Sequence, residues 1–489
     1  MKKTQLIKSI IFCIAFLIIF SFVSMIIVRK NDAINSDFYC QERNSIDVLY
    51  LGSSHAYSSI SPMDMYNEYG FTGYVRASSC QRSWESYTLL EESLKYQQPK
   101  VVVYEVMSSY HDEAQLETFS RDVFDAMRPS KTMVDGVLAD IEGTDTDILS
   151  YLIPMFRYHD RWETLNQDDF EFMMKKSPEP TKGFMVKCII DPVVNYDPNR
   201  FNSDAEPRKL SEKSEKYIRK MKKLCDDNGI SFVMVKVPTE YVPYWDVSMY
   251  KGIKELADDM EVPFIDYNVG ENKLDIDWSK DTDDQGNHLN YYGAQKTTKA
   301  IGKYLNSHFD LPDHRDKHLW SESEALKYSV IVTENLMISE NSFLNYLKMV
   351  NESFGKDDDY LIIITSRSNV LNEMPEDVHN YLLSMGDDLV YSGDNAVDPN
   401  AFIVRNGNVL YKKQDKKDIR ELVPVERHTI SIVNLGDKTG DCCDINIDGK
   451  EMGKNSAGLN IIIYNVKTGE LIDSIFSKYD ENGILAVYR

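Results

Sequence analysis

Apolar and polar residues follow a regular order along the first two thirds of the chain. Short apolar runs rich in β-branched residues predict buried strands, and longer runs with apolar residues every three or four positions predict helices. The predicted strands are Asp47–Leu51, Tyr74–Ala77, Lys100–Val106, Ile230–Val237 and Val262–Asp266. The predicted helices are Met63–Tyr69, Trp84–Tyr96, Ser211–Asp227, Met249–Met260 and about Tyr292–Phe309. This alternation predicts an α/β fold, with helices on the faces of a parallel sheet.

Residues 107–210 break this order and predict an insertion that is helical in its first part. The segment Tyr151–Phe170 mixes apolar and charged residues, and Ser177–Pro207 is a loop rich in Pro, Asp and Asn. Within the first segment, the polar run His159, Asp160, Arg161 and Trp162 is a candidate for substrate contact. Residues at helical spacing more often form a partly buried surface element, so both readings stay open.

Residues 326–489 have a different pattern, typical of a separate α+β domain. The polar run from Leu311 to Glu324 is the predicted linker. A strand at Tyr328–Thr333, a helix at Ser342–Val350, a strand at Tyr360–Thr365 and a helix at Pro375–Ser384, ending at Gly386, come first. Short strands follow at Ala401–Val404, Val409–Lys412, Thr429–Val433, Asp444–Ile447, Asn460–Asn465 and Leu471–Phe476. Turns suited to hairpins lie at Asn406-Gly407, Asp448-Gly449 and Lys467–Gly469.

The N-terminal residues 1–30 predict a signal-anchor helix. Ser9–Val28 carries no charge, follows three lysines and precedes Arg29 and Lys30. Twenty residues of helix span about 30 Å, enough to cross the hydrocarbon core of a bilayer. No small-x-small cleavage site lies around Ser21–Met25, so we expect the helix to stay uncleaved. The slight excess of positive charge before it predicts a cytoplasmic N-terminus and an extracytoplasmic remainder.

Composition narrows the function classes. The chain of 489 residues suits two or three domains, and its 55 basic against 78 acidic residues argue against general nucleic-acid binding. None of the seven cysteines shows metal-ligand spacing, so we expect no metal site. We expect ordinary thiols, although a Cys40–Cys80 disulfide remains open for an extracytoplasmic protein.

Two distant segments carry the residues with catalytic potential. Ser53 and Ser54 follow the first strand directly, where a turn at the carboxyl edge of a parallel sheet presents side chains to a ligand. His288 lies just before the last helix of the same domain, and Asp284 lies four residues earlier. A serine, a histidine and an acid in reach of one another suit acyl transfer. Taken singly, such serines are usually helix caps and such histidines are loop residues.

The motif Leu51-Gly52-Ser53-Ser54-His55, followed by Asp284-Gln-Gly-Asn-His288-Leu-Asn290-Tyr-Tyr-Gly293-Ala294, resembles the SGNH (GDSL-like) hydrolase superfamily. The resemblance covers about residues 45–312 and implies a flavodoxin-like three-layer α/β/α sandwich without a cofactor. Carried over by position, it implies Ser54 as nucleophile, His288 as base and Asp284 as its acid partner.

Three features depart from the family pattern. Ser53 stands where an aspartate is usual, and this leaves Ser53 open as an alternative nucleophile. The Asp284–His288 spacing is one residue longer than usual, so Asp281 or Asp283 could pair with the histidine instead. No asparagine follows Val101–Val106, where the chain has Glu105 and Ser108. The expected oxyanion donors are therefore the backbone N–H of Ser54 and, as a substitute, the Gln81 side chain.

The Gly-Ser-Ser variant resembles the membrane-anchored cell-envelope branch, which includes D-alanyl-lipoteichoic-acid transfer and alginate O-acetylation proteins. This resemblance implies an extracytoplasmic serine acyltransferase or esterase that modifies a cell-surface polysaccharide or teichoic acid with O-acetyl or D-alanyl groups. An integral membrane O-acyltransferase is the implied partner. The alternative is a non-catalytic glycan-binding or envelope-assembly protein that retains the fold.

The C-terminal region carries a second resemblance. Ala457-Gly458-Leu459-Asn460 followed by Thr468-Gly469-Glu470-Leu471 resembles the ILEI/PANDER-like domain. In that family the Gly-Leu-Asn segment precedes the helices and central strand that here come before it, so the resemblance implies a circularly permuted domain over 326–489. It suggests glycan binding, and a purely structural cap is the alternative.

Overall fold

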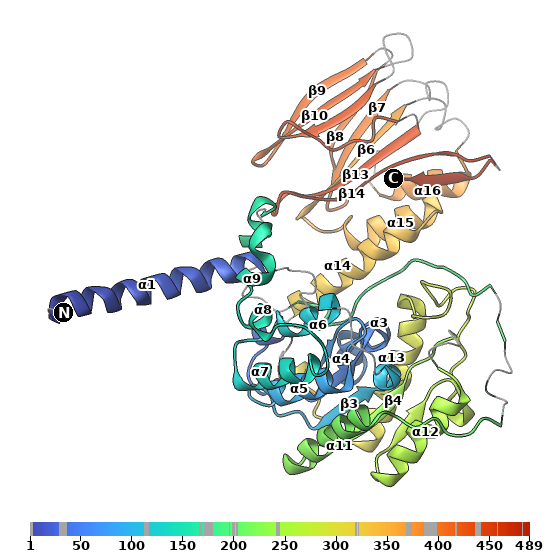
Figure 1. Cartoon of the computed structure of the whole chain (residues 1–489). Coiled ribbons are helices and arrows are strands. Elements are labelled where there is room, and N and C mark those ends of the chain that lie inside the picture. The colour runs from blue at the N-terminus through green and yellow to red at the C-terminus, as the bar shows by residue number, and fades with distance from the viewer. Residues whose placement is uncertain are drawn as a thin grey trace. The chain divides into compact units, whose positions relative to one another are not determined.

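The structure is a computed structural model of the whole chain (Figure 1). It describes every residue except 1–2, 29–36, 112–116, 166–168, 171–178, 195, 198–200, 202–203, 241–244, 318–319, 321, 368–373, 386–398, 416–417, 436–441, 457 and 482. The chain divides into two units, Met1–Tyr328 and Ser329–Arg489.

A five-stranded parallel sheet forms the centre of the first unit. Its strands are β1 (Val48–Gly52), β2 (Gly73–Ala77), β3 (Val101–Glu105), β4 (Ser231–Lys236) and β5 (Phe264–Asp266). Their order in the sheet is β2-β1-β3-β4-β5, with every neighbouring pair parallel. In a doubly wound sheet of this order, ligands bind where the chain changes direction, at the carboxyl ends of β1 and β3. The predicted α/β class and all five predicted strands are confirmed.

Helices cover both faces of this sheet because alternate strand residues point to opposite sides. One core contains Leu49, Leu51, Val102 and Tyr104. The helices α5 (Ser83–Ser93), α11 (Glu212–Asp227) and α12 (Val247–Asp259) pack there. The other core contains Val48, Tyr50, Val101 and Val103. The helices α3 (Ser54–Ser59), α4 (Pro62–Tyr69) and α13 (Tyr291–His308) contribute to it.

Local sequence explains where several of these helices begin. The Ser61 hydroxyl accepts from Asp64 N, and Pro62 fits the first turn of α4 because its missing N–H would have no helical partner. Ser211 caps α11, as predicted, by accepting from Ser214 N. The Asn290 side chain accepts from two backbone N–H groups at the start of α13, which fixes the orientation of the loop before it.

The insertion is helical at first, as predicted. Its elements are η2 (Met107–Tyr110), α6 (Glu117–Phe124), α7 (Lys131–Asp140), α8 (Ile148–Leu152), α9 (Met155–Tyr158) and η3 (His159–Glu163). Residues 179–194 then run without helix or strand. This strap bonds to β2 through Val75 N and Lys182 O, and to the end of α3 through Met185 N and Tyr57 O. Part of the predicted loop Ser177–Pro207 lies outside the described residues.

The N-terminal helix α1 (Lys3–Ile27) contains an apolar stretch, Ile7–Ser24, long enough to cross a membrane. Among the described residues it is the one helix that meets this criterion. Short 3-10 turns complete the first unit at η1 (Phe38–Cys40), η4 (Gly270–Asn272) and η5 (Arg315–Lys317). Each cysteine of the chain is a free thiol, so the Cys40–Cys80 disulfide left open by the sequence is not formed.

The strand predicted at Tyr328–Thr333 is wrong, because these residues lie inside the helix α14 (Glu322–Ser339). Tyr328, Val332 and Met337 are buried at helical spacing. The Tyr328 hydroxyl contacts the Ser61 hydroxyl (2.8 Å) and an Asp64 carboxylate oxygen (2.6 Å). A β-branched run thus takes the helical form because tertiary contacts outweigh its local preference.

The second unit contains two antiparallel sheets and helices. The larger sheet has the order β15-β14-β13-β6-β7-β8 and the smaller one β12-β11-β10-β9. The bounds are β6 (Tyr360–Arg367), β7 (Asn400–Arg405), β8 (Asn408–Gln414), β9 (Asp418–Val425), β10 (His428–Leu435), β11 (Cys443–Ile447), β12 (Lys450–Glu451), β13 (Gly458–Asn465), β14 (Glu470–Tyr479) and β15 (Leu485–Tyr488). The helices α15 (Phe343–Ser353) and α16 (Glu376–Ser384) pack on one face of the larger sheet, and the smaller sheet packs on the other. The predicted end of α16 at Gly386 lies outside the described residues.

Candidate active site

Ser54 begins α3 at the carboxyl end of β1, at the switch point of the sheet. Gly52 closes the strand with φ of +153°, and a Cβ there would lie 2.8 Å from the Glu105 Cβ on β3. Any larger residue would push the two strands apart. The glycine therefore lets the chain turn sharply against β3 and brings Ser54 to the edge of the sheet.

Ser54, His288 and Asp284 form one chain of hydrogen bonds. The Ser54 Oγ lies 2.7 Å from His288 Nε2, and His288 Nδ1 lies 2.6 Å from Asp284 Oδ2. Because the carboxylate accepts the Nδ1 hydrogen, Nε2 is left with a lone pair toward the serine hydroxyl. This is the arrangement that a serine nucleophile with a histidine base needs.

Asp284 also holds the backbone of the histidine. Its Oδ1 accepts from His288 N at 2.6 Å, and its Oδ2 accepts from Asn287 Nδ2 at 3.2 Å. Partial burial alone would raise the pKa of Asp284, but the hydrogen bonds from His288 and Asn287 outweigh it and hold the pKa below its ordinary value. The carboxylate therefore remains charged at neutral pH.

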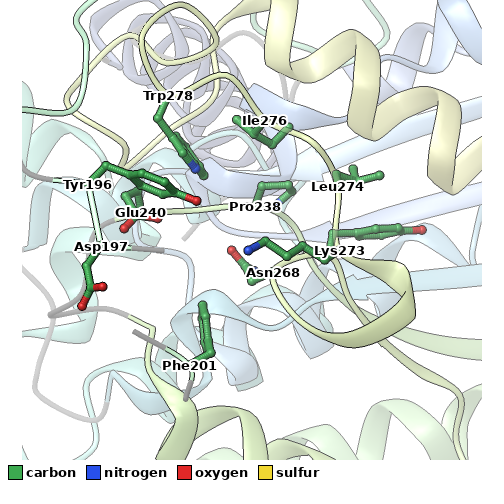
Figure 2. Close-up of a pocket in the computed structure, with 11 residues that line it drawn as sticks. Tyr196, Asp197, Phe201, Pro238, Glu240, Asn268, Lys273, Leu274, Ile276 and Trp278 are labelled. Atoms are coloured by element: carbon green, nitrogen blue, oxygen red, sulfur yellow. The ribbon is translucent and has the colours of Figure 1, made fainter. Parts of the chain in front are cut away.

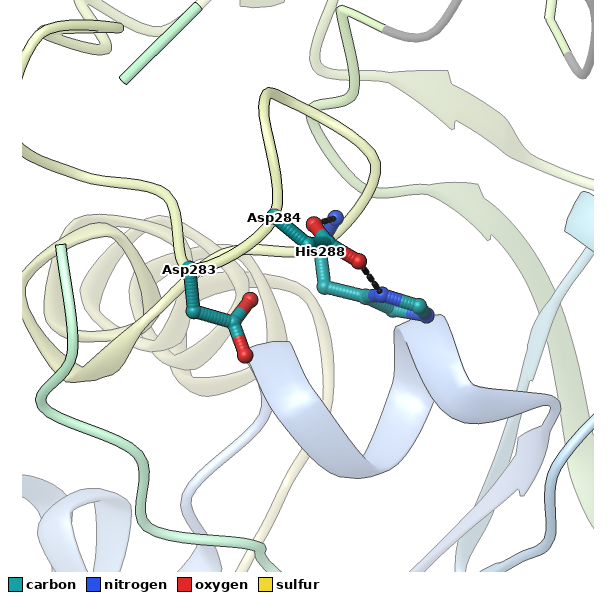
Figure 3. Close-up of side chains that lie close together, drawn as sticks. All are labelled: Asp283, Asp284 and His288. Carbon is teal, nitrogen blue, oxygen red and sulfur yellow. Dashed lines mark hydrogen bonds and ion pairs between the residues drawn. The ribbon is translucent and has the colours of Figure 1, made fainter. Parts of the chain in front are cut away.

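The other two candidate acids make different contacts. Asp281 is buried and pairs with Lys296 Nζ at 2.6 Å, and it also accepts from Asp277 N. Asp283 pairs with Lys187 Nζ at 3.1 Å. Figure 3 shows the dashed contacts running between Asp284 and His288, with the Asp283 carboxylate set apart from them. Of the three acids left open by the sequence, Asp284 is the one bonded to the imidazole.

Neighbouring loops brace the segment that carries Asp284 and His288. The Thr239 hydroxyl lies 2.9 Å from Gly286 O and 3.1 Å from Asn287 O. Glu240 N donates to Gly286 O at 2.7 Å, so the turn after β4 holds the two residues that precede His288. Sequence reasoning missed this support, since a Pro-Thr-Glu turn carries no signal of its tertiary partners.

The structure distinguishes the two serines. Ser53 is buried, and its hydroxyl has no hydrogen-bond partner among the described residues. Ser54 is half-buried and meets the imidazole. The Ser54 backbone N–H, at the first position of α3, makes no hydrogen bond within the described part of the chain. It is thus available to an oxyanion formed beside the Ser54 hydroxyl.

The Gln81 side chain, predicted as a substitute oxyanion donor, makes other hydrogen bonds in this structure. Its side-chain amide donates to Ser86 Oγ at 2.9 Å and to Arg76 O at 3.3 Å. Both N–H groups are therefore used to hold the turn after β2, and the side-chain oxygen accepts from Ser78. The oxyanion role of Gln81 stays a prediction, and it would require the amide to give up one of these hydrogen bonds within a buried loop.

Three further polar groups lie at this end of the sheet. Lys236 and Glu105 form a fully buried ion pair of 3.1 Å between β4 and β3. His55 is buried beside the site, with its ring centroid 4.8 Å from that of His288. Burial, with the charge of Lys236 nearby, holds the pKa of His55 well below its ordinary value, so this ring is neutral. From the sequence, the position of His55 beside His288 was indicated only by its place next to Ser54.

The side chains of Asp283, Asp284 and His288 could also approach one metal ion, since one ligand atom of each lies within 4.8 Å of the others. Both nitrogens of His288, however, already face Ser54 and Asp284. A metal on these residues would displace the Asp284 hydrogen bond and the Lys187 ion pair. Asp283, Asp284 and His288 therefore fit a role in the hydrogen bonds and ion pair described above better than a role as metal ligands.

A pocket lies at the carboxyl ends of β4 and β5, next to the loop that carries His288. Its empty volume, including the open solvent at its mouth, is about 310 Å³. Figure 2 shows Asn268, Lys273 and Pro238 at its middle, with the aromatic rings of Tyr196, Trp278 and Phe201 around it. Glu240 lines this pocket and also bonds to Gly286, so the pocket and the Asp284–His288 segment share one wall.

The polar run from His159 to Trp162 lies in η3, away from these bonds. Arg161 donates to the carbonyl oxygens of Ile27 and Val28 and to Asp169. A substrate role for this run stays a prediction, and the contacts of Arg161 are with the end of the N-terminal helix and with Asp169.

Comparisons with known proteins add little to this geometry. No protein-family model and no curated protein matches the chain. An acylhydrolase from Bacteroides fragilis NCTC 9343 has 14% sequence identity and a TM-score of 0.28, covering 57% of this chain and 97% of its own. A GDSL-like lipase from Bacteroides thetaiotaomicron VPI-5482 has 13% identity and a TM-score of 0.25, covering 54% of this chain and 88% of its own. At these scores, function has to be inferred from the residues around Ser54.

Proposed function

We propose that the protein is a serine acyltransferase or esterase that forms an acyl-enzyme on Ser54. The observation that carries this proposal is the continuous Ser54–His288–Asp284 chain, with contacts of 2.7 and 2.6 Å. Ser54 comes from a segment 234 residues before the one that carries both Asp284 and His288. Their alignment at the switch point of a parallel sheet favours a catalytic role over separate capping roles.

In the first step, the Ser54 oxygen attacks the carbonyl carbon of an ester donor while His288 Nε2 takes the hydroxyl proton. Asp284 stabilises the resulting imidazolium through its hydrogen bond to Nδ1. The backbone N–H of Ser54 donates to the oxyanion. The intermediate collapses to an acyl-Ser54 ester, and the leaving alkoxide receives the proton from His288.

In the second step, an acceptor hydroxyl loses its proton to His288 and attacks the acyl-Ser54 carbonyl. Collapse returns the proton to the Ser54 oxygen and releases the acylated acceptor. Water in place of the acceptor gives hydrolysis. Whether the enzyme transfers the acyl group or hydrolyses it thus depends on whether an acceptor occupies the site when the acyl-enzyme forms.

We further propose the SGNH superfamily and its flavodoxin-like sandwich for the first unit, on the strength of the strand order and the Gly52-Ser53-Ser54-His55 motif. A membrane anchor at α1, with the remainder extracytoplasmic, suits an acceptor such as a cell-surface polysaccharide or teichoic acid. An integral membrane O-acyltransferase would then supply acetyl or D-alanyl groups. The permuted ILEI-like assignment and glycan binding by the second unit belong to the same proposal.

A non-catalytic envelope protein is the second candidate function. The engaged amide of Gln81 favours it, since it leaves the Ser54 N–H as the one oxyanion donor identified among the described residues. Such a protein would keep the fold and bind glycans without turnover.

A fluorophosphonate probe separates the two functions. It should label the full-length protein in detergent at one site, and mass spectrometry should find the adduct on Ser54. Ser54→Ala should abolish labelling, while the matched variant Ser53→Ala should retain it. Absence of labelling in the wild-type protein, or labelling that survives Ser54→Ala, would refute the acyl-enzyme proposal.

A further inference from the structure

The stretch from Leu149 to Phe170 exposes five large apolar side chains, here called the apolar rim. Trp162 is 67% exposed and Phe156 is 57% exposed, and the other members are also exposed. The rim consists of Leu149, Leu152, Phe156, Trp162 and Phe170. Clusters of this kind on a protein surface mark interaction sites, whereas single exposed apolar residues need no explanation.

The opposite side of the same helices is fixed to the protein. Tyr151 is buried against Phe124, and its hydroxyl contacts Ser120 at 2.8 Å. Tyr158 donates to Asp125 at 2.6 Å. The inner face is therefore packed and hydrogen-bonded, so the exposed rim is held in place.

A cation between these two sides strengthens the attachment. Arg121 stacks on the Tyr151 ring at 4.1 Å and donates to the Ser150 hydroxyl and backbone oxygen. It also forms ion pairs with Glu117 and Asp125. Arg121 therefore attaches α8, which carries part of the apolar rim, firmly to α6.

The rim adjoins the end of the apolar helix α1. Arg161 Nη1 lies 2.8 Å from Ile27 O and 2.7 Å from Val28 O, and its Nη2 lies 2.8 Å from Asp169. A cation at a helix C-terminus satisfies carbonyl groups that have no helical partner. Figure 1 shows α9 beside this end of α1. The apolar stretch ends at Ser24, about 4.5 Å of helix before Ile27.

We propose that the apolar rim inserts into the interface of the lipid bilayer that α1 crosses, on the side where α1 emerges. The occupant is lipid, because α9 and η3, which carry Phe156 and Trp162, both contact the apolar helix α1. Tryptophan and phenylalanine suit the boundary between headgroups and acyl chains, where such elements insert by about 5–10 Å. The proposal rests on the membrane anchor in the proposed function and adds a second membrane contact to it.

Two contacts with the bilayer restrict motion in a way that one helix alone does not. A single helix would let the first unit tilt and rotate about its linker. With the rim inserted, the unit keeps one orientation, and Ser54 keeps one height above the bilayer. That would suit a site that exchanges acyl groups with a membrane-bound donor.

Tryptophan fluorescence of the full-length protein in phosphatidylcholine vesicles tests this. The chain has five tryptophans, and α1 contains none. Trp84, Trp245 and Trp320 are buried and Trp278 is half-buried, so bromine atoms on the lipid chains should quench mainly Trp162. We expect quenching in wild type, loss of most of the quenched signal in Trp162→Phe, and unchanged quenching in the control Trp278→Phe. Bromines placed near the headgroup should quench more than deep ones.

Equal quenching in wild type and Trp162→Phe, or no quenching of Trp162, would overturn the proposal and would favour a protein partner for the rim. Trp162 is exposed and its replacement by Phe should not disturb folding. Resistance of the same samples to alkaline carbonate extraction reports on α1 separately. Carbonate-resistant protein without Trp162 quenching would overturn the rim contact and leave the anchor standing, whereas extraction by carbonate would overturn the anchor.

Discussion

Replacing Asp284 with asparagine should disable the site without changing its shape. The Asp284 carboxylate accepts from the ring Nδ1 and from the backbone N–H of His288, both at 2.6 Å. Asparagine has nearly the same size, but its NH2 group donates. If the carbonyl oxygen continues to accept from the backbone, the NH2 group faces Nδ1 and the ring takes the other tautomer. Nε2 then carries the hydrogen and cannot take the proton of Ser54.

The expected loss follows from this change of tautomer. In serine hydrolases, the same kind of substitution lowers kcat by roughly 10⁴-fold. At about 1.4 kcal/mol for each tenfold change, this equals about 5.5 kcal/mol of transition-state stabilisation. The free energy of unfolding should change much less, because Asp284 is more than a third exposed and asparagine can keep one of its hydrogen bonds.

The assay is the second-order rate of fluorophosphonate labelling, checked by hydrolysis of a p-nitrophenyl ester. The matched controls are Asp283→Asn and Asp281→Asn, since these acids pair with Lys187 and Lys296. We expect Asp283→Asn to stay within about tenfold of wild type, as for the loss of a partly exposed ion pair. If Asp284→Asn keeps its rate while Asp283→Asn loses it, the assignment of the acid is wrong.

Three further outcomes follow from the structure. Lys236→Met should lower the free energy of unfolding by about 3–5 kcal/mol in urea, because it strands a buried Glu105 carboxylate, and adding Glu105→Gln should restore much of the loss. In the second unit, burial and the charges of Glu470 and Asp473 raise the pKa of Glu334 to about 7. The pKa of Glu334 in the folded protein exceeds its unfolded value of about 4.3, so the folded state binds the proton more tightly. The resulting contribution to the free energy of unfolding is present at low pH and is lost as the pH rises toward 7. Glu334→Gln should therefore raise Tm relative to wild type more at pH 8 than at pH 5; equal shifts would contradict this. Finally, if the pocket beside His288 holds the acceptor, Trp278→Ala should slow transfer to a glycan while fluorophosphonate labelling of Ser54 continues; an unchanged transfer rate would exclude the pocket.

Strands buried on both faces were the elements best predicted from sequence. The bounds of each of the five parallel strands agree with the prediction to within two residues. Continuous apolar runs such as Val101–Glu105 are typical of strands buried on both faces of a parallel sheet, so their position is well defined by the sequence. The short helix α3 was missed because Ser54–Ser59 has the composition of a turn. In the second unit, β9 was missed because it contains Pro424, which an edge strand tolerates.

The part of the candidate site that depends only on the order of strands and helices could be predicted from the sequence. Ser54 follows β1 and His288 precedes α13, so a wound sheet brings both to one edge. The Ser54 backbone N–H was predicted as an oxyanion donor and is available in the structure. The engagement of the Gln81 amide was not predictable, because its contacts with Ser86 and with a backbone oxygen of Arg76 do not follow from spacing. The same limit applies to the pairing of Glu105 with Lys236, whose members lie 131 residues apart.

The extra residue between Asp284 and His288 has a local explanation. Gln285 and Gly286 both adopt positive φ, +58° and +94°, so the chain makes a tight reversal between the acid and the histidine. A Cβ on Gly286 would lie 2.6 Å from the Glu240 Cβ, so this reversal needs glycine at its closest approach to the neighbouring loop. The reversal directs the His288 N–H at the carboxylate that also accepts from the ring. The longer spacing thus lets one aspartate accept from both the backbone N–H and the ring Nδ1 of His288. Replacing Gly286 with alanine should weaken the contact between Asp284 and His288 more than it shifts Ser54.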